Sequence, residues 1–436
     1  MRPRFPEAQS IRAMVVLLCL ALMPVALSAP RDTVDSLATL IENNFYDAQK
    51  AATIAGELRQ QAQAGAFDHV ADPRDLASLL TRKLKPFDRH FNVTWTGKPL
   101  EEHGPGSAVE FPALNSEAQD RRTNYGFRSV EMLPGAIGYI DMRFFADFAK
   151  PSDPARAAAD AALQFVSGAD AVIIDLRFNG GGSPAMVGYV VSAFVPADAN
   201  AYNTIVRREG TESERPKQAF AHPRLDVPLY VLISGRTASA AESTAYTLQA
   251  ARRATIVGES SAGAANPGGE LPVGEGFNVF VPTGTPVNPV TRKNWEGAGV
   301  QPDVRASSEH ALVRAEILAL EAVLAKQPPG PQALDTRWTL EALRAEQTPP
   351  TGPSLSEYKG AYADAAVSIT DGRLILKRGR QPPLTLMRLG ADAFFVRSEP
   401  FRRVLFERDA GGKVKGLTYV RSSGQSFWYP RSTSEP

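Results

Sequence analysis

The chain has 436 residues and a mass of 47.0 kDa, which exceeds one ordinary compact domain and predicts two or three domains. Its 43% hydrophobic and 22% charged content is typical of a soluble globular protein. The formal charge is only +1 and no block of lysine or arginine occurs, so nothing in the sequence indicates a nucleic-acid-binding surface.

The N-terminus has the pattern of a secretory signal peptide. Basic residues in 1–4 precede an apolar run over about 13–29, in which Ala26 and Ser28 have the spacing that signal peptidase requires. A membrane anchor is the competing interpretation, but the run contains Pro24 and is shorter than the roughly 20 residues that span a bilayer. We therefore expect a cleaved signal peptide, no membrane span in the mature chain, and a periplasmic location.

The signal peptide is expected to cover residues 1–28 and contains the single cysteine, Cys19. Cleavage would leave a mature chain without a thiol. We therefore expect no disulfide, no catalytic thiolate and no cysteine metal site in the mature protein.

An N-terminal helical region is predicted over 29–95. Apolar residues at helical spacing indicate a helix over 33–63, and Asp72-Pro73 is a typical start for a second helix. Pro86 ends that helix and residues 91–95 resemble a strand, so His90 is predicted to lie on a turn between helix and strand.

From about residue 136 onward the pattern alternates between strands and helices, which predicts an α/β core within 96–327. Consecutive apolar residues over 171–174 are typical of a strand that helices cover on both faces. The strands are predicted over 137–142, 171–176, 229–233 and 255–257, and the helices over 154–166, 183–194, 239–251 and 309–326.

The C-terminal part is predicted to be a separate antiparallel β domain over 354–436, after a proline-rich linker over 328–353 that includes a short helical piece. Short strands with Asp-Gly and Gly-Gly turns indicate a meander or small barrel. No catalytic constellation is visible in it. Strands are predicted over 373–377, 384–389, 393–396, 404–407 and 414–420.

Ser239 is a candidate nucleophile. It follows a buried strand and opens a helix, so its hydroxyl would lie near the unpaired N–H groups of the helix start. However, Ser239-Ala-Ala-Glu242 also has the pattern of a capping box, in which both side chains merely satisfy the first helical turn. This segment alone does not decide between the two interpretations.

A second candidate segment is Asp175-Leu-Arg-Phe-Asn-Gly-Gly-Gly182, which places three glycines after a buried strand. The Gly181 N–H could join the Ala240 N–H in an oxyanion hole, although glycine runs also form plain turns. The run lacks the Gly-Lys-Ser/Thr ending of nucleotide-binding loops, which argues against a nucleotide.

Three motifs occur in the same order as in a known family. The glycine segment resembles Asp-Leu-Arg-x-Asn-x-Gly-Gly, the serine segment resembles Thr-Ala-Ser-Ala-x-Glu, and Trp295-Glu-Gly-Ala-Gly-Val-Gln-Pro-Asp303 resembles a late Gly-Val-x-Pro-Asp element. The chain thus resembles, over about 30–327, the tail-specific, C-terminal processing serine peptidases, which include the tricorn protease core and the interphotoreceptor retinoid-binding protein repeats. The resemblance implies a crotonase-like spiral of ββα units, Ser239 as nucleophile, and the Gly181 and Ala240 amides as oxyanion donors.

The resemblance also bears on the general base. In the processing-protease branch a lysine follows the serine by about 25 residues, but Ala264 occupies that position here, and no lysine occurs between Lys217 and Lys293. The tricorn-like branch instead uses a histidine from the N-terminal region. His90, in Asp-Arg-His-Phe, matches it.

An imidazole can serve as a general base near neutral pH, and a carboxylate beside it would orient it. The resemblance implies that Glu296 supplies this carboxylate. Tricorn-like members have a serine immediately before the histidine, whereas this chain has Arg89, so a proton relay through that serine is not expected.

Several features of the wider family have no counterpart. Only about 45 residues separate His90 from the first core strand, too few for a PDZ domain. The remaining histidines show no paired spacing, so no metal or other cofactor is predicted. These histidines are His69, His103, His222 and His310.

The sequence therefore predicts a secreted serine endopeptidase that acts on peptides or proteins through an acyl-enzyme. The alternative is a non-catalytic protein that binds an apolar ligand or a peptide on the same scaffold. The C-terminal β domain could itself recognise peptides or a partner, which follows only from its separateness.

Overall fold

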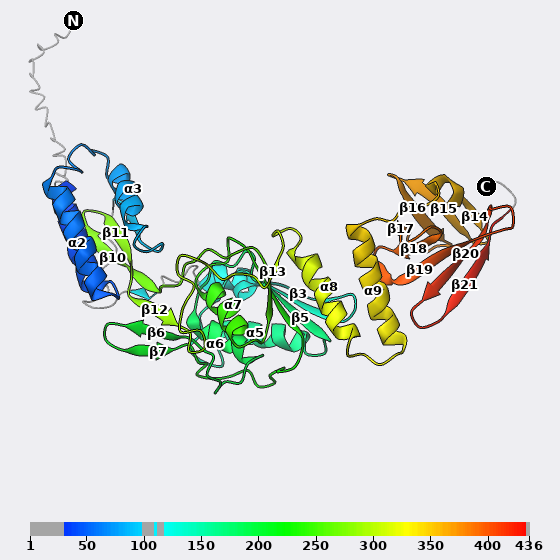
Figure 1. Ribbon diagram of the computed structural model, residues 1–436, viewed down its shortest axis with the longest axis horizontal. Coiled ribbons are helices and arrows are strands. Elements are labelled where there is room, and N and C mark those ends of the chain that lie inside the picture. The colour runs from blue at the N-terminus through cyan, green and yellow to red at the C-terminus, as the bar shows by residue number, and fades with distance from the viewer. Residues whose placement is uncertain (1–29, 98–108, 111–116, 433–436) are drawn as a thin grey trace, which may run out of the picture.

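The computed structural model describes residues 30–97, 109–110 and 117–432. The predicted signal peptide and Cys19 lie outside these ranges. Within them, no helix combines the length and the apolar character that crossing a membrane requires. The molecule is elongated: the N-terminal helices lie at one end, a mixed α/β core in the middle, and a C-terminal sheet at the other end (Figure 1).

The N-terminal helices pack against a small antiparallel sheet with the strand order β1-β11-β10-β2. Side chains of Asp47 and Asp72 cap α2 and α3 by accepting backbone N–H bonds, as N-cap carboxylates do. The sequence predicted helices here, but not this sheet, whose hairpin β10–β11 comes from far along the chain. The elements are α1 (Pro30–Asn44), α2 (Ala48–Gln63), α3 (Pro73–Leu84), β1 (Asn92–Trp95), β2 (Val109–Glu110), β10 (Gly268–Gly274) and β11 (Phe277–Pro282).

The core is built on a six-stranded sheet with the order β13-β9-β8-β5-β4-β3. Within this sheet β4, β5, β8, β9 and β13 are parallel to one another, and β3 pairs antiparallel with β4 at one edge. The mixed α/β architecture predicted from the sequence is confirmed. The strands are β3 (Phe127–Leu133), β4 (Ile137–Met142), β5 (Ala171–Asp175), β8 (Leu229–Ile233), β9 (Thr255–Gly258) and β13 (Val304–Arg305).

Helices cover both faces of this sheet (Figure 1). Successive strand residues point to opposite faces, so Val172 and Ile174 pack with α5, α6 and α7, whereas Ala171 and Ile173 pack with α8. All four side chains are buried, which explains the unbroken apolar run in the sequence. The helices are α5 (Pro154–Phe165), α6 (Pro184–Ser192), α7 (Ala240–Ala250), α8 (Ala311–Leu324) and α9 (Pro331–Gln347).

A three-stranded sheet of order β12-β6-β7 lies beside the core and was not anticipated from the sequence. Its strands are antiparallel. The strands are β6 (Thr204–Arg207), β7 (Thr211–Ser213) and β12 (Gly284–Val287). Two short elements precede β3, namely α4 (Glu117–Arg122) and the 3-10 turn η1 (Asn124–Gly126).

The C-terminal part is an eight-stranded antiparallel sheet in which each strand pairs with the next. Ala363 N–H donates to Pro430 O (3.0 Å) and Ser432 N–H donates to Ala361 O (2.9 Å), so the first and last strands are also joined. Buried aromatic and aliphatic side chains fill the interior. The elements are η2 (Leu355–Tyr358), β14 (Gly360–Tyr362), β15 (Ala365–Thr370), β16 (Arg373–Arg378), β17 (Leu384–Arg388), β18 (Ala393–Val396), β19 (Glu399–Arg408), β20 (Val414–Arg421) and β21 (Ser426–Pro430).

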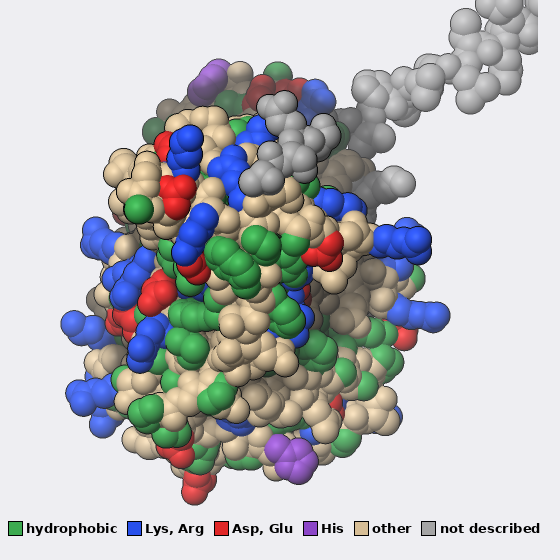
Figure 2. Space-filling view, turned by 90° about the vertical axis from the view of Figure 1, so that its right-hand side faces the viewer, with side chains coloured by type: hydrophobic (Ala, Val, Ile, Leu, Met, Phe, Trp, Pro, Cys, Tyr) green, Lys and Arg blue, Asp and Glu red, His purple; other side chains and the backbone are tan. Residues whose placement is uncertain are grey.

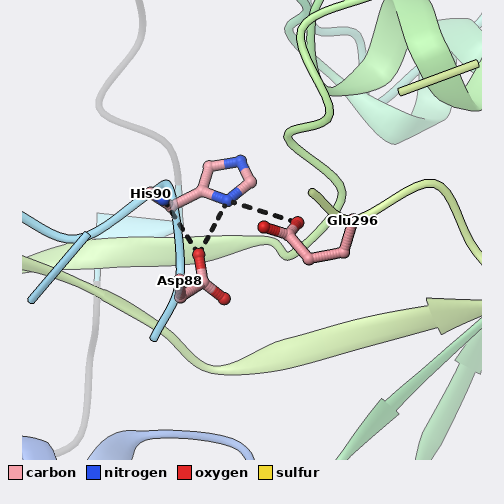
Figure 3. A group of neighbouring side chains, drawn as sticks. All are labelled: Asp88, His90 and Glu296. Atoms are coloured by element: carbon pink, nitrogen blue, oxygen red, sulfur yellow. Dashed lines mark hydrogen bonds and ion pairs between the residues drawn. The ribbon is translucent and has the colours of Figure 1, made fainter. Parts of the chain in front are cut away.

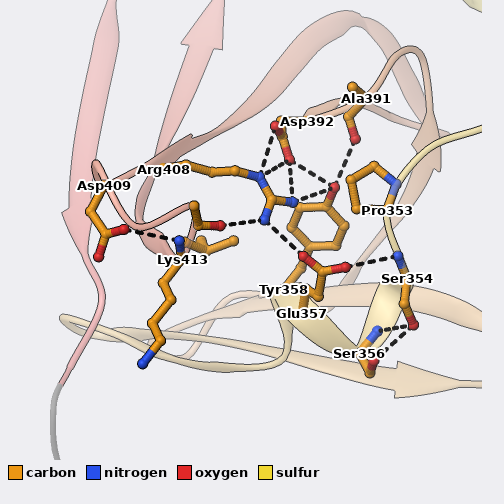
Figure 4. A network of polar contacts seen from close by, with 12 residues as sticks. Pro353, Ser354, Ser356, Glu357, Tyr358, Ala391, Asp392, Arg408, Asp409 and Lys413 are labelled. Carbon is orange, nitrogen blue, oxygen red and sulfur yellow. Dashed lines mark hydrogen bonds and ion pairs between the residues drawn. The ribbon is translucent and has the colours of Figure 1, made fainter.

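A polar network around Arg408 fastens the start of this sheet (Figure 4). The Arg408 guanidinium donates to Asp392 (2.8 Å) and Glu357 (2.7 Å), and the Tyr358 hydroxyl donates to Asp392 (2.8 Å). Hydrogen bonding from Arg408 lowers the pKa of Asp392. The network joins η2 to the β18 and β19 strand ends.

The outer surface of the C-terminal sheet carries scattered apolar side chains among lysines and arginines (Figure 2). Four large ones are more than a third exposed: Ile369, Leu405, Phe427 and Trp428. Single exposed apolar residues of this kind are normal on a protein surface.

Arg403 of β19 connects this sheet to α9. Its side chain is almost fully buried, with 3% of the residue exposed, and its guanidinium donates to Trp338 O and Pro400 O, both at 2.6 Å. The guanidinium also lies 4.9 Å from the Trp338 ring centre. A single arginine therefore bonds to both α9 and the sheet.

Candidate active site

Ser239 lies at the turn between β8 and α7 in a strained conformation. Its φ of +54° and ψ of −121° are rare for a residue with a side chain, whereas a plain N-cap adopts the extended region. Strained strand-to-helix turns of this kind expose catalytic nucleophiles in hydrolases. Capping alone therefore does not account for the conformation of Ser239.

The Glu242 carboxylate, in the first turn of α7, holds this turn in place. It is fully buried and accepts hydrogen bonds from the N–H groups of Ser239 (2.9 Å), Gly263 (2.7 Å) and Ala264 (2.9 Å) and from Ser261 Oγ (2.5 Å). The loop over 261–264 is therefore fastened to the start of α7. Ala264, which occupies the family's lysine position, contributes only its backbone.

The glycine loop packs directly against the serine turn. A Cβ atom on Gly181 would lie 2.8 Å from Ser239 Cβ and 3.1 Å from Ala240 N, so no larger residue fits without a shift. Gly181 also has a φ of +112°, which favours glycine. The buried Asn179 holds the loop, because it donates to Met142 O (3.0 Å) and accepts from Ala238 N–H (3.1 Å).

The backbone donors near Ser239 are not equivalent. Ala240 N–H makes no hydrogen bond to any described residue, as expected for the first turn of a helix. The Gly181 N–H, which the sequence analysis assigned to the oxyanion, donates instead to Asn179 Oδ1 (2.9 Å). The next N–H, of Gly182, is unengaged among the described residues, and Gly182 lines the pocket that contains Ser239.

His90 and Glu296 lie together, with Asp88 as a third member of the cluster (Figure 3). His90 Nδ1 is 3.2 Å from Asp88 Oδ1 and 3.9 Å from Glu296 Oε2. The His90 backbone N–H also donates to Asp88 Oδ1 (2.9 Å). Both carboxylates therefore face the same ring nitrogen, which leaves Nε2 directed away from them.

Each carboxylate is held by a neighbouring segment. Asn266 Nδ2 donates to Asp88 Oδ2 (2.6 Å), and Ala265 N–H donates to Glu296 Oε2 (2.7 Å). Burial raises the pKa of Glu296, and the nearby charge of Asp88 raises it further. The ligand atoms of Asp88, His90 and Glu296 lie within 4.8 Å of one another, so this is also where the described residues could hold a metal ion.

The role of Asp88 was not assigned from the sequence. An aspartate commonly accepts a hydrogen bond from the backbone two residues later, and the Asp-Arg-His order is that of such a turn. This local signal could have identified Asp88 as a neighbour of His90. The contacts of Asn266 and Glu242 depend on tertiary packing and have no such signal.

Residues 262–266 lie between the serine and histidine groups and bond to both of them. Arg89 donates to Ala262 O (2.8 Å), while the following residues bond to Glu242 and Glu296 as described. Among the described residues, no hydrogen bond joins His90 to Ser239. The 262–266 segment therefore sets the spacing between the two groups.

A cavity of about 480 Å³ is lined in part by Gly182 of the glycine loop, although Ser239 itself does not line it. A narrower pocket of about 20 Å³, lined by Ser239, Ala240 and Trp295, adjoins it. The two share five lining residues: Gly182, Pro184, Ile205, Glu214 and Pro267. The proposed nucleophile is thus reached from a cavity of the size that ligands commonly occupy.

Comparison with known protein families finds a match within the α/β core. Residues 136–306 match the model of peptidase family S41. A carboxyl-terminal-processing protease of Synechocystis is 35% identical over 132 residues, which is 30% of this chain and 29% of that protein. The chain thus matches less than a third of the length of this relative.

Solved structures align with this chain at low identity and with TM-scores below 0.5. A lipoprotein from Streptococcus agalactiae aligns with a TM-score of 0.45 and 13% identity, over 70% of this chain and 99% of that one. The photosystem II D1 C-terminal processing protease gives 0.40 and 17%, over 65% and 94%. The tricorn protease gives 0.39 and 12%, over 72% and 37%. The family match contains the glycine loop, Ser239 and Glu296 but not His90, so the core over 136–306 is the part of this chain that is similar to peptidase family S41.

Proposed function

We propose that the protein is a serine peptidase that forms an acyl-enzyme on Ser239. The observation that carries the proposal is the strained Ser239 turn at the start of α7, packed against a glycine loop at the edge of a cavity. A backbone held in this conformation exposes the hydroxyl between free N–H donors.

In the proposed reaction, His90 Nε2 removes the proton from Ser239 Oγ as the oxygen attacks the scissile carbonyl. The resulting oxyanion accepts hydrogen bonds from Ala240 N–H and from the glycine loop. Gly181 N–H is already bonded to Asn179, so we assign the second donor to the unengaged Gly182 N–H. His90 then protonates the leaving amine, and water activated by His90 hydrolyses the ester.

The two carboxylates hold the imidazole for this task. Asp88 Oδ1 is the nearer partner of Nδ1, at 3.2 Å against 3.9 Å for Glu296, so Asp88 favours the tautomer whose Nε2 accepts a proton. Both negative charges stabilise the imidazolium that forms during acylation.

Direct contact between His90 and Ser239 is proposed to form when substrate binds. Catalytic hydrogen bonds are often long in a free enzyme and tighten only in the complex. Arg89 occupies the position of the family's serine and donates to Ala262 O, so it supports the docking of the histidine loop instead of relaying a proton.

The finer assignments also belong to this proposal. They are a crotonase-like spiral in the core, cleavage within peptide or protein chains, a signal peptide over 1–28 and a periplasmic location. We also propose the domain boundaries that the sequence predicts, with an N-terminal helical region over 29–95, a core over 96–327, a linker over 328–353 and a β domain over 354–436.

A second candidate function is peptide binding without hydrolysis. It is favoured by the absence of a His90–Ser239 hydrogen bond among the described residues, together with the wide cavity. The two functions predict different behaviour of the serine toward reactive inhibitors.

The test combines labelling with hydrolysis of a peptide library. A fluorophosphonate is expected to label Ser239 and abolish hydrolysis, and Ser239→Ala and His90→Ala are expected to lower kcat by about 10⁴-fold to 10⁶-fold. The exposed residues Ser260 and His310 provide controls, since their alanine variants keep labelling and turnover. Undiminished hydrolysis in either site variant would sink the proposal, and tight peptide binding without turnover would favour the second candidate.

A further inference from the structure

Of the acidic residues that line the cavity, Glu214 alone also lines the Ser239 pocket, and it has no part in the proposed reaction. Glu214 follows β7, and its Oε2 accepts hydrogen bonds from Ser243 Oγ (2.5 Å) and Asn203 Nδ2 (2.9 Å). Asn203 is fully buried and is itself held by Asn288, which donates to Asn203 Oδ1 (2.9 Å). The position of the Glu214 carboxylate is therefore fixed by a rigid polar network.

The other oxygen of this carboxylate is available to a ligand. Glu214 Oε1 accepts no hydrogen bond from any residue that the structure describes, and Glu214 lines both the wide cavity and the Ser239 pocket. Burial raises the pKa of Glu214, so a cation that reached it would restore the charge that burial disfavours. One oxygen is thus held by the protein, and the other has no partner among the described residues.

Glu214 also lies close to the proposed nucleophile. Its partner Ser243 is four residues after Ser239 in α7, which corresponds to about 6 Å along a helix axis. Among the described residues that line the Ser239 pocket, Glu214 alone has an ionisable side chain. A group bound at Oε1 would therefore lie within a residue or two of the bond under attack.

We propose that Glu214 binds the guanidinium or ammonium group of an arginine or lysine in the substrate, next to the scissile bond. This inference rests on the proposed peptidase function. A charge-assisted hydrogen bond to Oε1 would hold the head group. Apolar walls shared by the two cavities, formed by Pro184, Ile205 and Pro267, would cover the aliphatic stem of the side chain.

The dimensions of the two cavities set the route of that side chain. The Ser239 pocket has a volume of only about 20 Å³, so a long side chain enters through the 480 Å³ cavity and reaches Glu214 across the shared wall. A carboxylate that lines a wide cavity and has one unpartnered oxygen selects for long side chains with N–H donors at the tip.

The cavity also has basic lining residues, but none of them lines the Ser239 pocket. Lys150 and Lys217 are exposed, Arg207 donates to Thr283 Oγ1 (2.9 Å), and Arg215 donates to the backbone oxygens of Asp198 and Ala199. They therefore do not occupy the place of the substrate's basic group beside Ser239.

The experiment compares arginine with citrulline, its uncharged isostere, at each position from P3 to P3′ of a peptide that the enzyme cleaves. The wild-type enzyme is expected to favour arginine at one position by at least tenfold in kcat/KM. Glu214→Gln is expected to reduce this ratio to below about twofold. Glutamine retains an oxygen that Ser243 and Asn203 can bond, so the variant should fold, and its thermal denaturation checks this.

Glu209→Gln is the matched control. Glu209 lies exposed between β6 and β7, lines neither cavity, and its loss should leave the arginine preference at the wild-type ratio. Equal rates with arginine and citrulline at every position, or an unchanged ratio in Glu214→Gln, would overturn the Glu214 proposal while leaving the peptidase function intact.

A binding measurement separates this inference from the proposed function and needs no variant. If no peptide is cleaved and Ser239 is not labelled, the peptidase function fails. Fluorescence polarisation with the wild-type protein then compares the same labelled peptides, and at least tenfold weaker binding of the citrulline form supports Glu214 as a site for basic residues. Equal binding of the two forms overturns it.

Discussion

At the scale of single residues, the cluster around His90 contains two carboxylates where one would orient the ring. Asp88 lies nearer to Nδ1 and bonds to the backbone of His90 as well, whereas Glu296 is more distant and is held by Ala265 N–H. Distance and connectivity both indicate that Asp88 sets the tautomer and that Glu296 adds negative charge.

Substitution of each carboxylate by its amide separates these roles. Asp88→Asn should lower kcat by about 10²-fold to 10⁴-fold, because an amide N–H facing Nδ1 favours the wrong tautomer. Glu296→Gln should cost less. Steady-state kinetics with a cleavable peptide measure both, and circular dichroism checks the fold. A larger loss in Glu296→Gln than in Asp88→Asn would reverse the assignment.

A second prediction concerns the glycine loop. Gly181→Ala places a methyl group 2.8 Å from Ser239 Cβ in a backbone region that disfavours side chains. We expect activity to be lost and the free energy of unfolding to fall by about 1–3 kcal/mol. Gly180→Ala is the control, because a Cβ there meets nothing within 4 Å. Kinetics and urea unfolding measure both, and full activity in Gly181→Ala would contradict the packing argument.

At the scale of elements, helix α8 contains Glu316, a carboxylate whose pKa is raised and which is influenced by Glu346 of α9. Burial raises the pKa of Glu316 from its ordinary value to about 7, and the charge of Glu346 contributes. The folded protein therefore retains a proton that the unfolded chain has already released. Stability from this site is complete below about pH 4.5, decreases as the pH rises to about 7, and is constant above that.

Glu316→Gln should therefore stabilise the protein at pH 8.5 by roughly 1–3 kcal/mol relative to the wild type, with little effect at pH 4.5. Urea unfolding at the two pH values measures the difference. Glu309→Gln, at an exposed position just before α8, should show no such dependence. A variant that is equally stable relative to wild type at both pH values would contradict the raised pKa.

The elements of the α/β core could be predicted from the sequence, because their signals are local. The apolar run at 171–174 depends on neighbouring residues only, and the same is true in the N-terminal region of the Asp72-Pro73 helix start and the turn before Phe91. Strand β10 could not be predicted, since it begins with Gly268-Gly269 and includes Pro272, residues that weaken strand signals. Its fold depends on long-range pairing with β11 and β2.

The same distinction applies to the candidate site. The motif order pointed to Ser239, His90 and Glu296, and the structure brings His90 and Glu296 together. The unusual dihedral angles of Ser239, the Asn179 bond that occupies Gly181 N–H, and the orientation of Glu214 are all imposed by tertiary packing. No spacing of residue types in the sequence specifies them.

At the scale of the whole molecule, α9 joins the core to the C-terminal sheet. Arg403 links the two by bonding to Trp338 O and stacking on its ring, and burial lowers the pKa of its guanidinium. Removing the Arg403 side chain leaves the carbonyl oxygens of Trp338 and Pro400 without this donor and creates a cavity between α9 and the sheet.

Arg403→Ala should therefore destabilise the C-terminal sheet by roughly 2–4 kcal/mol and expose the 348–354 segment to protease. Limited proteolysis with mass spectrometry locates the cleavage, and hydrogen exchange shows whether the sheet alone is affected. Arg402→Ala is the neighbouring control, since Arg402 is partly exposed and pairs with Glu399. Similar protease resistance in the wild type and Arg403→Ala would show that other contacts fix the sheet.

Phe91, next to His90, belongs to the N-terminal helical packing, whereas Ser239 follows a strand of the central sheet, and residues 262–266 bond to the groups around both. A random mutagenesis screen for lost turnover should consequently return two separate classes. One class would surround the serine turn. The other would consist of folded proteins altered at buried positions such as Phe45 or Phe91, which line neither cavity. In these variants the loop that carries His90 would be displaced.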